Sequence, residues 1–199
     1  MYVGALSALL DIDVSAIETL IGEQYKGKEK LLKPNLEALN LGRDWALGNL
    51  PCPIGLQLEK ADAVGNRIFV EGNAAAALGA VYGGATVCAW YPITPSSSVA
   101  EAFQKYCQKY RTGSDGQTRY AMIQAEDEIA SVGIVVGAGW NGARAFTATS
   151  GPGVSLMNEF IGLAYFAEIP VTIIDVQRGG PSTGMPTRTQ QSDILAAAY

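Results

Sequence analysis

The sequence predicts an α/β fold, in which a parallel-sheet domain follows a short helical segment. Short apolar runs rich in Val, Ile, Thr and aromatic residues recur from residue 67 onward, and helical stretches separate them. This alternation is typical of parallel strands joined by helical crossovers and covered on both faces. Before it, the stretch 49–66 carries several prolines and glycines, which is typical of a linker. The domains expected are therefore 1–48, 49–66 and 67–199.

Residues 1–48 are expected to be helical. Asp13 can cap a helix because its carboxylate accepts from the free N–H groups of a first turn. The apolar residues of that helix fall on one face: Val14, Ile17, Leu20 and Ile21. A second helix is expected around Leu36, Leu39 and Trp45, after a charged connector at 25–30.

Five strands and four long helices are expected in the main domain. The predicted strands are 68–70, 85–90, 120–124, 145–149 and 171–175. The predicted helices are 72–82, 97–110, 128–139 and 154–166. The segment 177–199 is expected to start as an irregular loop and then become helical. Because the sequence starts and stops inside helical patterns, we interpret it as a fragment of a longer polypeptide.

The composition argues against several classes of partner. The 199 residues carry a net charge of −5 and no lysine- or arginine-rich run, so nucleic acid and anionic membranes are not expected as partners. No signal peptide and no apolar run of membrane-spanning length is present, and a cytoplasmic location is expected.

Cysteine and histidine usage limits the chemistry. Cys52, Cys88 and Cys107 lack the spacing of metal ligands, so no metal or iron–sulfur site is expected in this chain. The sequence contains no histidine. Acid–base chemistry would then depend on carboxylates, hydroxyl groups or a cofactor.

The turn 91–97 follows a predicted strand and carries Pro92 and Pro95 on either side of Thr94. Proline fixes its own φ and restricts the preceding residue, so Thr94 is expected on a stiff turn at the carboxyl end of a strand. Ligands of open α/β sheets bind at that edge. The turn is either a small-anion contact or only a rigid connection.

Two acidic residues flank Asp127 where a strand gives way to a helix. One possibility is that Glu126 and Glu128 only stabilise the helix, by capping its first N–H groups and by complementing its dipole. However, Ile129, Val132 and Val136 indicate a buried helix, with Glu128 near its buried side. A carboxyl group placed there is expected to have a raised pKa and to share a proton at neutral pH.

Two further strand ends carry polar residues. The turn 149–153 holds Ser150, a possible helix N-cap, and Gly151, where the backbone can approach a ligand closely. Arg178 follows the last predicted strand and suits a carboxylate ligand, with a surface ion pair as the alternative. Together the four strand ends predict one site at one edge of the sheet.

Four motifs then identify a resemblance. The stretches 91–97, 124–128, 147–157 and 175–184 read YPITPSS, QAEDE, TATSGPGVSLM and DVQRGGPSTG. In this order they closely resemble the alpha subunit of 2-oxoacid:ferredoxin oxidoreductases, most of all the 2-oxoglutarate type. The resemblance covers residue 67 to the end, and residues 1–48 resemble the end of a gamma domain fused ahead of the alpha part. It implies that 67–199 is a thiamine diphosphate pyrimidine-binding, Rossmann-like domain, truncated at its C-terminus.

The resemblance implies an enzyme that oxidatively decarboxylates a 2-oxoacid to an acyl-CoA, with coenzyme A as acceptor and ferredoxin taking the electrons. Thiamine diphosphate carries the carbon chemistry. Glu128 matches the family's cofactor glutamate, which binds the aminopyrimidine ring nitrogen; its spacing to Gly137 and Gly142 favours it over Glu126. The resemblance also places Thr94 and Arg178 at the substrate, and Ser150 and Gly151 at the cofactor.

The resemblance further implies a separate beta subunit that holds Mg²⁺ and a 4Fe–4S cluster, because the Gly-Asp-Gly diphosphate motif is missing from this sequence. Paired alpha–beta units are then expected. Two alternatives stay open. The enzyme acts on pyruvate or a branched-chain 2-oxoacid, or the chain is a non-catalytic structural subunit in which Glu128 only caps a helix.

Overall fold

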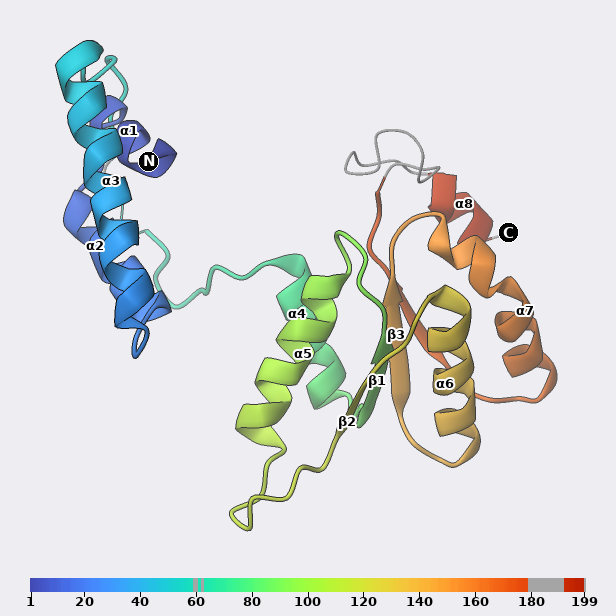
Figure 1. Cartoon of the computed structure of the whole chain (residues 1–199). Helices are drawn as coiled ribbons and strands as arrows, with labels where there is room; N and C mark the ends of the chain where they lie inside the picture. Colours follow the sequence, from blue (N-terminus) through green and yellow to red (C-terminus); the bar gives the residue numbers. More distant parts are fainter. Residues whose placement is uncertain (59–60, 62, 179–191, 199) are drawn as a thin grey trace. The chain divides into compact units, whose positions relative to one another are not determined.

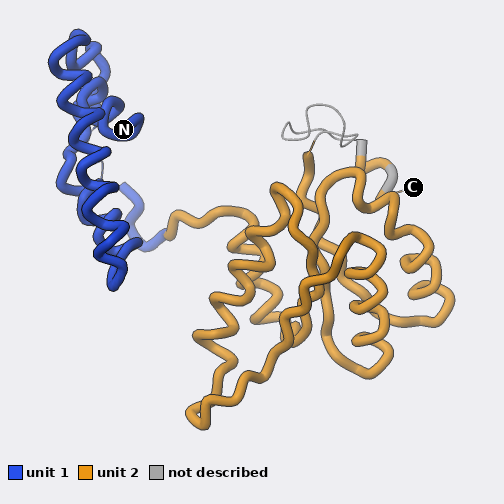
Figure 2. The backbone as a smooth tube through the Cα atoms, viewed as in Figure 1, with its two compact units in different colours: residues 1–67 blue, residues 68–199 orange. Residues whose placement is uncertain are grey.

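The computed structural model describes residues 1–58, 61, 63–178 and 192–198. The chain divides into two compact units, 1–67 and 68–199, coloured separately in Figure 2. Most of the loop expected after Arg178 lies outside the described residues.

The first unit is helical, as predicted, with α1 (Tyr2–Leu9), α2 (Val14–Gln24) and α3 (Glu29–Asn49). Asp13 caps α2, because its Oδ1 accepts from the Ser15 N–H at 2.9 Å. The predicted apolar face of α2 is incomplete, since Leu20 is 64% exposed. Helices α1 and α3 approach closely at Gly4, where a Cβ would lie 2.9 Å from the backbone nitrogen of Arg43.

The second unit is an α/β fold with a four-stranded parallel sheet in the order β2-β1-β3-β4. Its strands are β1 (Val87–Trp90), β2 (Ala121–Gln124), β3 (Ala145–Thr149) and β4 (Thr172–Asp175). Its helices are α4 (Gly72–Tyr82), α5 (Ser97–Tyr110), α6 (Glu128–Trp140), α7 (Gly153–Phe166) and α8 (Ser192–Ala198). These bounds confirm the predicted alternation of strands and helices to within a few residues.

The strand predicted at 68–70 is wrong, because these residues form no strand and Phe69 is 98% exposed. Their apolar character resembles that of a strand, but a strand also needs a neighbour to accept its backbone hydrogen bonds. Among the described residues, the sheet ends at β2 on one side and at β4 on the other.

Helices cover both faces of the sheet (Figure 1): α4 and α5 pack together on one face, and α6 and α7 on the other. On the first face Phe103 of α5 meets Phe146 of β3 edge to face, with ring centroids 4.8 Å apart. On the second, Val132 of α6 and Met157 of α7 are fully buried. Central strand β3 is buried along its whole length, which fixes the ends of its neighbours in space.

The three cysteines, Cys52, Cys88 and Cys107, are free thiols. Burial raises the pKa of the Cys88 thiol to about 12, which suits a packing role. Within the described ranges, every helix is too short or too polar to cross a membrane.

A candidate active site at the carboxyl edge of the sheet

The neighbouring strands β1 and β3 send their chains to opposite faces of the sheet. Strand β1 leads into α5 on one face, whereas β3 leads into α7 on the other (Figure 1). A crevice opens where neighbouring strands diverge in this way, just outside their carboxyl ends. The five site residues predicted from the sequence follow the carboxyl ends of all four strands: Thr94 follows β1, Glu128 follows β2, Ser150 and Gly151 follow β3, and Arg178 follows β4.

Thr94 is exposed on a turn braced by hydrogen bonds from both sides. The Ile93 N–H donates to Ser97 Oγ at 3.0 Å, and that hydroxyl donates back to the Ile93 carbonyl at 3.1 Å. From α4, the Asn73 amide donates to the Pro95 carbonyl at 3.1 Å and to Ser98 Oγ at 2.8 Å. The predicted stiffness of the turn therefore rests on side chains as well as on its prolines.

The carboxylates at the start of α6 have separate roles. Asp127 is the N-cap, and its Oδ1 accepts from the Ala130 N–H at 2.8 Å. Glu126 is exposed, whereas Glu128 is half-buried in the first turn of α6. Because Asp127 satisfies the cap, Glu128 is not needed for it, and the helix-cap alternative for Glu128 is wrong. Ile129 is 46% exposed, so α6 is buried along Val132 and Val136 only.

Ser150 is buried but does not cap α7, contrary to one expectation. Helix α7 begins at Gly153 after Pro152, which caps it without a side-chain hydrogen bond. The Ser150 hydroxyl has no hydrogen-bond partner among the described residues. A buried hydroxyl without a partner is costly to leave unpaired, so this position favours a bound polar group.

Gly151 brings its turn against Arg178. Its φ is +47°, and a Cβ there would lie 2.8 Å from the Arg178 carbonyl oxygen, so only glycine fits. Arg178 Nη1 donates to the Thr94 carbonyl at 3.2 Å, which joins the ends of β4 and β1. Arg178 Nε is buried and has no partner in the described part of the chain. One edge of the guanidinium is therefore available to a bound carboxylate.

Tyr91 and Thr149, a buried polar pair at the carboxyl ends of β1 and β3, were not among the predicted site residues. Their hydroxyl groups are 2.7 Å apart, and the two residues are 5% and 0% exposed. Burial raises the pKa of Tyr91 above its usual range, and the nearby Glu128 carboxylate raises it further, against the hydrogen bond of Thr149 and the charge of Arg178. Tyr91 therefore stays a neutral phenol at neutral pH. Because Tyr91 lies between an apolar strand and a proline-containing turn, the sequence did not mark it as a polar site residue.

Gly153 was also missed, although it brings these groups together. A Cβ at Gly153 would collide with Thr149 Oγ1, and would lie 2.9 Å from Tyr91 Oη and 3.2 Å from Glu128 Cγ. Three polar side chains from different elements thus converge on one α-carbon. The glycine-rich turn predicted as a close approach to a ligand is equally a close approach to Glu128.

A pair of carboxyl groups, half-buried Asp175 and buried Asp193, lies next to this edge. Burial raises the pKa of Asp175 to about 7, and the hydrogen bond and charge of Asp193 raise it in the same direction, against the Gly151 N–H. Asp193 also accepts from the Gln177 amide at 3.2 Å. This pair joins α8 to the end of β4 beside Arg178.

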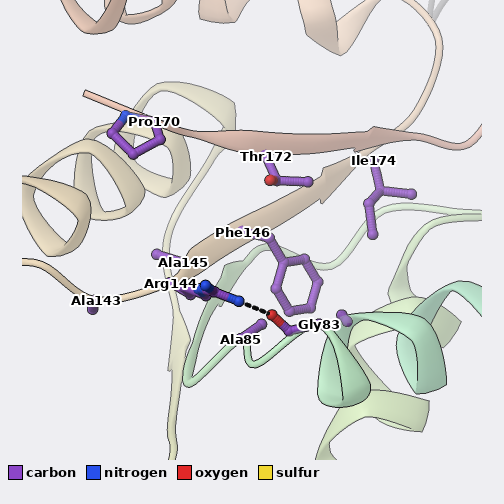
Figure 3. Close-up of a pocket in the computed structure, with 10 residues that line it drawn as sticks. Gly83, Ala85, Ala143, Arg144, Ala145, Phe146, Pro170, Thr172 and Ile174 are labelled. Atoms are coloured by element: carbon purple, nitrogen blue, oxygen red, sulfur yellow. Dashed lines mark hydrogen bonds between the residues drawn. The ribbon is translucent and has the colours of Figure 1, made fainter. Parts of the chain in front are cut away.

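A cavity of about 480 Å³ lies at the opposite, amino edge of the sheet (Figure 3). Its lining is mostly small and apolar, and its cation, Arg144, donates to the Gly83 carbonyl. None of the predicted site residues lines it. We therefore place the candidate site at the carboxyl edge, where the polar groups converge, and not at this cavity.

The comparisons with known proteins agree on one family. The sequence model of the family described as "Pyruvate flavodoxin/ferredoxin oxidoreductase, thiamine diP-bdg" matches residues 74–198. Subunit alpha of 2-oxoacid:ferredoxin oxidoreductase 2 from Aeropyrum pernix is 41% identical over 199 aligned positions, and the match covers 96% of this chain and 31% of that protein. The 2-oxoglutarate synthase subunit KorA of Methanocaldococcus jannaschii is 50% identical over 131 residues, 66% of this chain and 34% of that protein.

A solved structure is similar over nearly the whole chain. It is the 2-oxoglutarate:ferredoxin oxidoreductase from Magnetococcus marinus with 2-oxoglutarate, coenzyme A and succinyl-CoA bound. The sequences are 38% identical, the TM-score is 0.69, and the match covers 98% of this chain and 33% of that one. The chain spans about a third of the length of the relatives that match it over nearly all its residues.

Proposed function

The chain belongs to the pyruvate flavodoxin/ferredoxin oxidoreductase family, through the thiamine-diphosphate-binding domain that residues 74–198 match, and on this premise we propose that it is part of the alpha subunit of a 2-oxoglutarate:ferredoxin oxidoreductase. The reaction is the oxidative decarboxylation of the 2-oxoacid to its acyl-CoA, with electrons passed to ferredoxin. The names of the relatives from Methanocaldococcus jannaschii and Magnetococcus marinus support the choice of 2-oxoglutarate.

One observation carries the proposal: the fold brings Glu128, Thr94 and Arg178 to the same edge of the sheet from three different strand ends. Arg178 is bonded to the Thr94 carbonyl, and Glu128 lies beside Tyr91, which continues β1 toward Thr94. A carboxylate, a hydroxyl and a guanidinium are the groups that a cofactor ring nitrogen and a 2-oxoacid require.

The residues at this edge fit thiamine diphosphate. The Ser150 hydroxyl and Arg178 Nε are buried and unpaired among the described residues, so bound polar groups would complete their hydrogen bonding. The glycines at 151 and 153 leave the backbone of the turn bare of side chains. When bound, thiamine diphosphate supplies the nucleophilic carbon and the electron sink for decarboxylation.

Each of the chain's own residues then has a distinct task. The Glu128 carboxyl group binds the ring nitrogen of the aminopyrimidine and holds or releases the proton there. Thr94 binds the oxo or carboxylate oxygens of the substrate through its hydroxyl. Arg178 binds a substrate carboxylate through the guanidinium edge that carries Nε. Ser150 and Gly151 contact the cofactor from the turn before α7.

The remaining parts of the proposed enzyme lie on partners. Mg²⁺ and a 4Fe–4S cluster are assigned to a beta subunit that completes the cofactor site, and alpha–beta units pair in the cytoplasm. Residues 1–48 are assigned to the end of a gamma domain fused ahead of the alpha part. The similarity of almost the whole chain to the Aeropyrum pernix subunit alpha supports the fused arrangement.

The substrate is tested by assaying the complete enzyme, with coenzyme A and ferredoxin, against a panel of 2-oxoacids. We expect kcat/KM for 2-oxoglutarate to exceed that for pyruvate and branched-chain 2-oxoacids by about a hundredfold or more, because Arg178 can pair with the second carboxylate, which those substrates lack. A preference for pyruvate would contradict the substrate and leave the enzyme class standing. No activity with any 2-oxoacid would contradict the class.

A further inference from the structure

The carboxyl edge holds a cluster of polar side chains, Thr149, Tyr91 and Glu128, of which the functions assigned above use only Glu128. Thr149 ends β3, Tyr91 follows β1, and Glu128 begins α6, so the three side chains come from three separate elements. The Tyr91 and Thr149 hydroxyl groups are 2.7 Å apart, and the Glu128 side chain lies beside the phenol, against the same glycine, Gly153. Burial of the pair excludes water that would otherwise satisfy these groups.

The directions of hydrogen-bond donation in this cluster follow from the chemistry of its groups. A carboxylate can only accept a hydrogen bond, so toward Glu128 the Tyr91 phenol can act only as the donor. With its proton directed to Glu128, Tyr91 Oη can accept from the Thr149 hydroxyl group.

This cluster of side chains also has little freedom to rearrange. The α-carbon of Gly153 lies against all three groups, where a Cβ would be 2.9 Å from Tyr91 Oη and 3.2 Å from Glu128 Cγ. Tyr91 packs in the apolar cluster of Val132, Val136 and Met157, which holds its ring in place. A carboxylate held by a fixed phenol presents its other oxygen in one direction, and such preorganisation strengthens ligand binding.

From this geometry we propose that Tyr91 is a positioning residue: supported by Thr149, it holds one oxygen of Glu128 so that the other meets the aminopyrimidine of thiamine diphosphate. The inference rests on the proposed function, because it takes Glu128 as the cofactor carboxylate. It adds a residue that makes no contact with the cofactor and sets the affinity for it through Glu128.

The test is a titration of the complete enzyme, stripped of cofactor, with thiamine diphosphate and Mg²⁺, followed by quenching of tryptophan fluorescence. Tyr91→Phe keeps the ring and removes the hydroxyl group. We expect it to raise the Kd for thiamine diphosphate about tenfold, the effect of losing one hydrogen bond to a charged group. Tyr106→Phe, on α5 against the opposite face of the sheet, is the matched control and should leave the Kd unchanged.

Combining the Tyr91 and Glu128 substitutions distinguishes a positioning role of Tyr91 from a general loss of stability of the fold. In a Glu128→Ala background, Tyr91→Phe should have no further effect on the Kd, because the group that it positions is already missing. If Tyr91→Phe proves poorly folded, Thr149→Val serves instead, and should weaken binding in the same direction by a smaller factor.

Two results would overturn the inference. The Tyr91→Phe enzyme could bind thiamine diphosphate as tightly as the wild-type enzyme does, while Glu128→Ala binds it more weakly. That result would refute the role of Tyr91 and leave the proposed function intact. An equal loss with and without the Glu128 side chain would show that Tyr91 acts only on the fold. Failure of the wild-type enzyme to bind thiamine diphosphate would instead refute the proposed function itself.

Discussion

Glu128→Gln is expected to lower kcat of the complete enzyme by about 10²- to 10⁴-fold, the usual contribution of a positioned acid–base group. Glutamine keeps the size of the side chain and its ability to hydrogen-bond, but it cannot exchange a proton with the pyrimidine ring nitrogen. The KM for the 2-oxoacid should change little, because Thr94 and Arg178 bind the substrate. Steady-state kinetics with coenzyme A and ferredoxin give both values.

Glu126→Gln is the matched control for this variant. Glu126 lies two residues earlier in the same acidic stretch but is exposed. The Glu126→Gln enzyme should therefore keep the wild-type kcat. Equal turnover in the Glu128→Gln and wild-type enzymes would remove Glu128 from the chemistry.

Arg178→Gln is expected to raise the KM for 2-oxoglutarate about a hundredfold, since removing one partner of a buried charge pair typically costs several kcal/mol. The guanidinium carries both the bond to the Thr94 carbonyl and the buried Nε that awaits a partner. Glutamine cannot form the paired N–H contacts that a carboxylate prefers. The effect should appear in KM more than in kcat, because Glu128 is left in place.

Arg144→Gln controls for the loss of a positive charge from the domain. Arg144 lies at the amino edge of the sheet, where it donates to the Gly83 carbonyl (Figure 3). Its replacement should leave the KM for the 2-oxoacid within about twofold of the wild-type value, since charges this far from the site are screened. A similar rise in KM for both arginine variants would indicate a general electrostatic effect and contradict a direct contact of Arg178 with the substrate.

The periodicity of the sequence was enough to predict the sheet and its covering helices. Strand β3 and helix α5 have the predicted bounds, because a buried strand and an amphipathic helix leave clear apolar patterns. The strand predicted at 68–70 failed because an apolar run does not reveal whether a neighbouring strand is available. Similarly, the exposure of Leu20 and Ile129 depends on what packs against each helix.

The edge that carries the site was also predictable, because strand ends of a parallel sheet meet on one side. The contacts within the site were not. Tyr91 and Thr149 are 58 residues apart in the sequence, and nothing local marks them as a pair. Gly153 resembles an ordinary turn glycine until the three side chains around it are placed. The division of labour between Asp127 and Glu128 likewise depends on where α6 begins.

The central claim is that the carboxyl edge of this sheet binds the pyrimidine half of thiamine diphosphate through Glu128. An experimental structure of the complete enzyme with the cofactor bound tests it most directly, through the distance between the Glu128 carboxylate and the pyrimidine ring nitrogen. We expect a short, charge-assisted hydrogen bond of about 2.7–2.9 Å, with Tyr91 on the other carboxylate oxygen. A cofactor whose pyrimidine lies away from Glu128, with that carboxylate facing solvent, would contradict it.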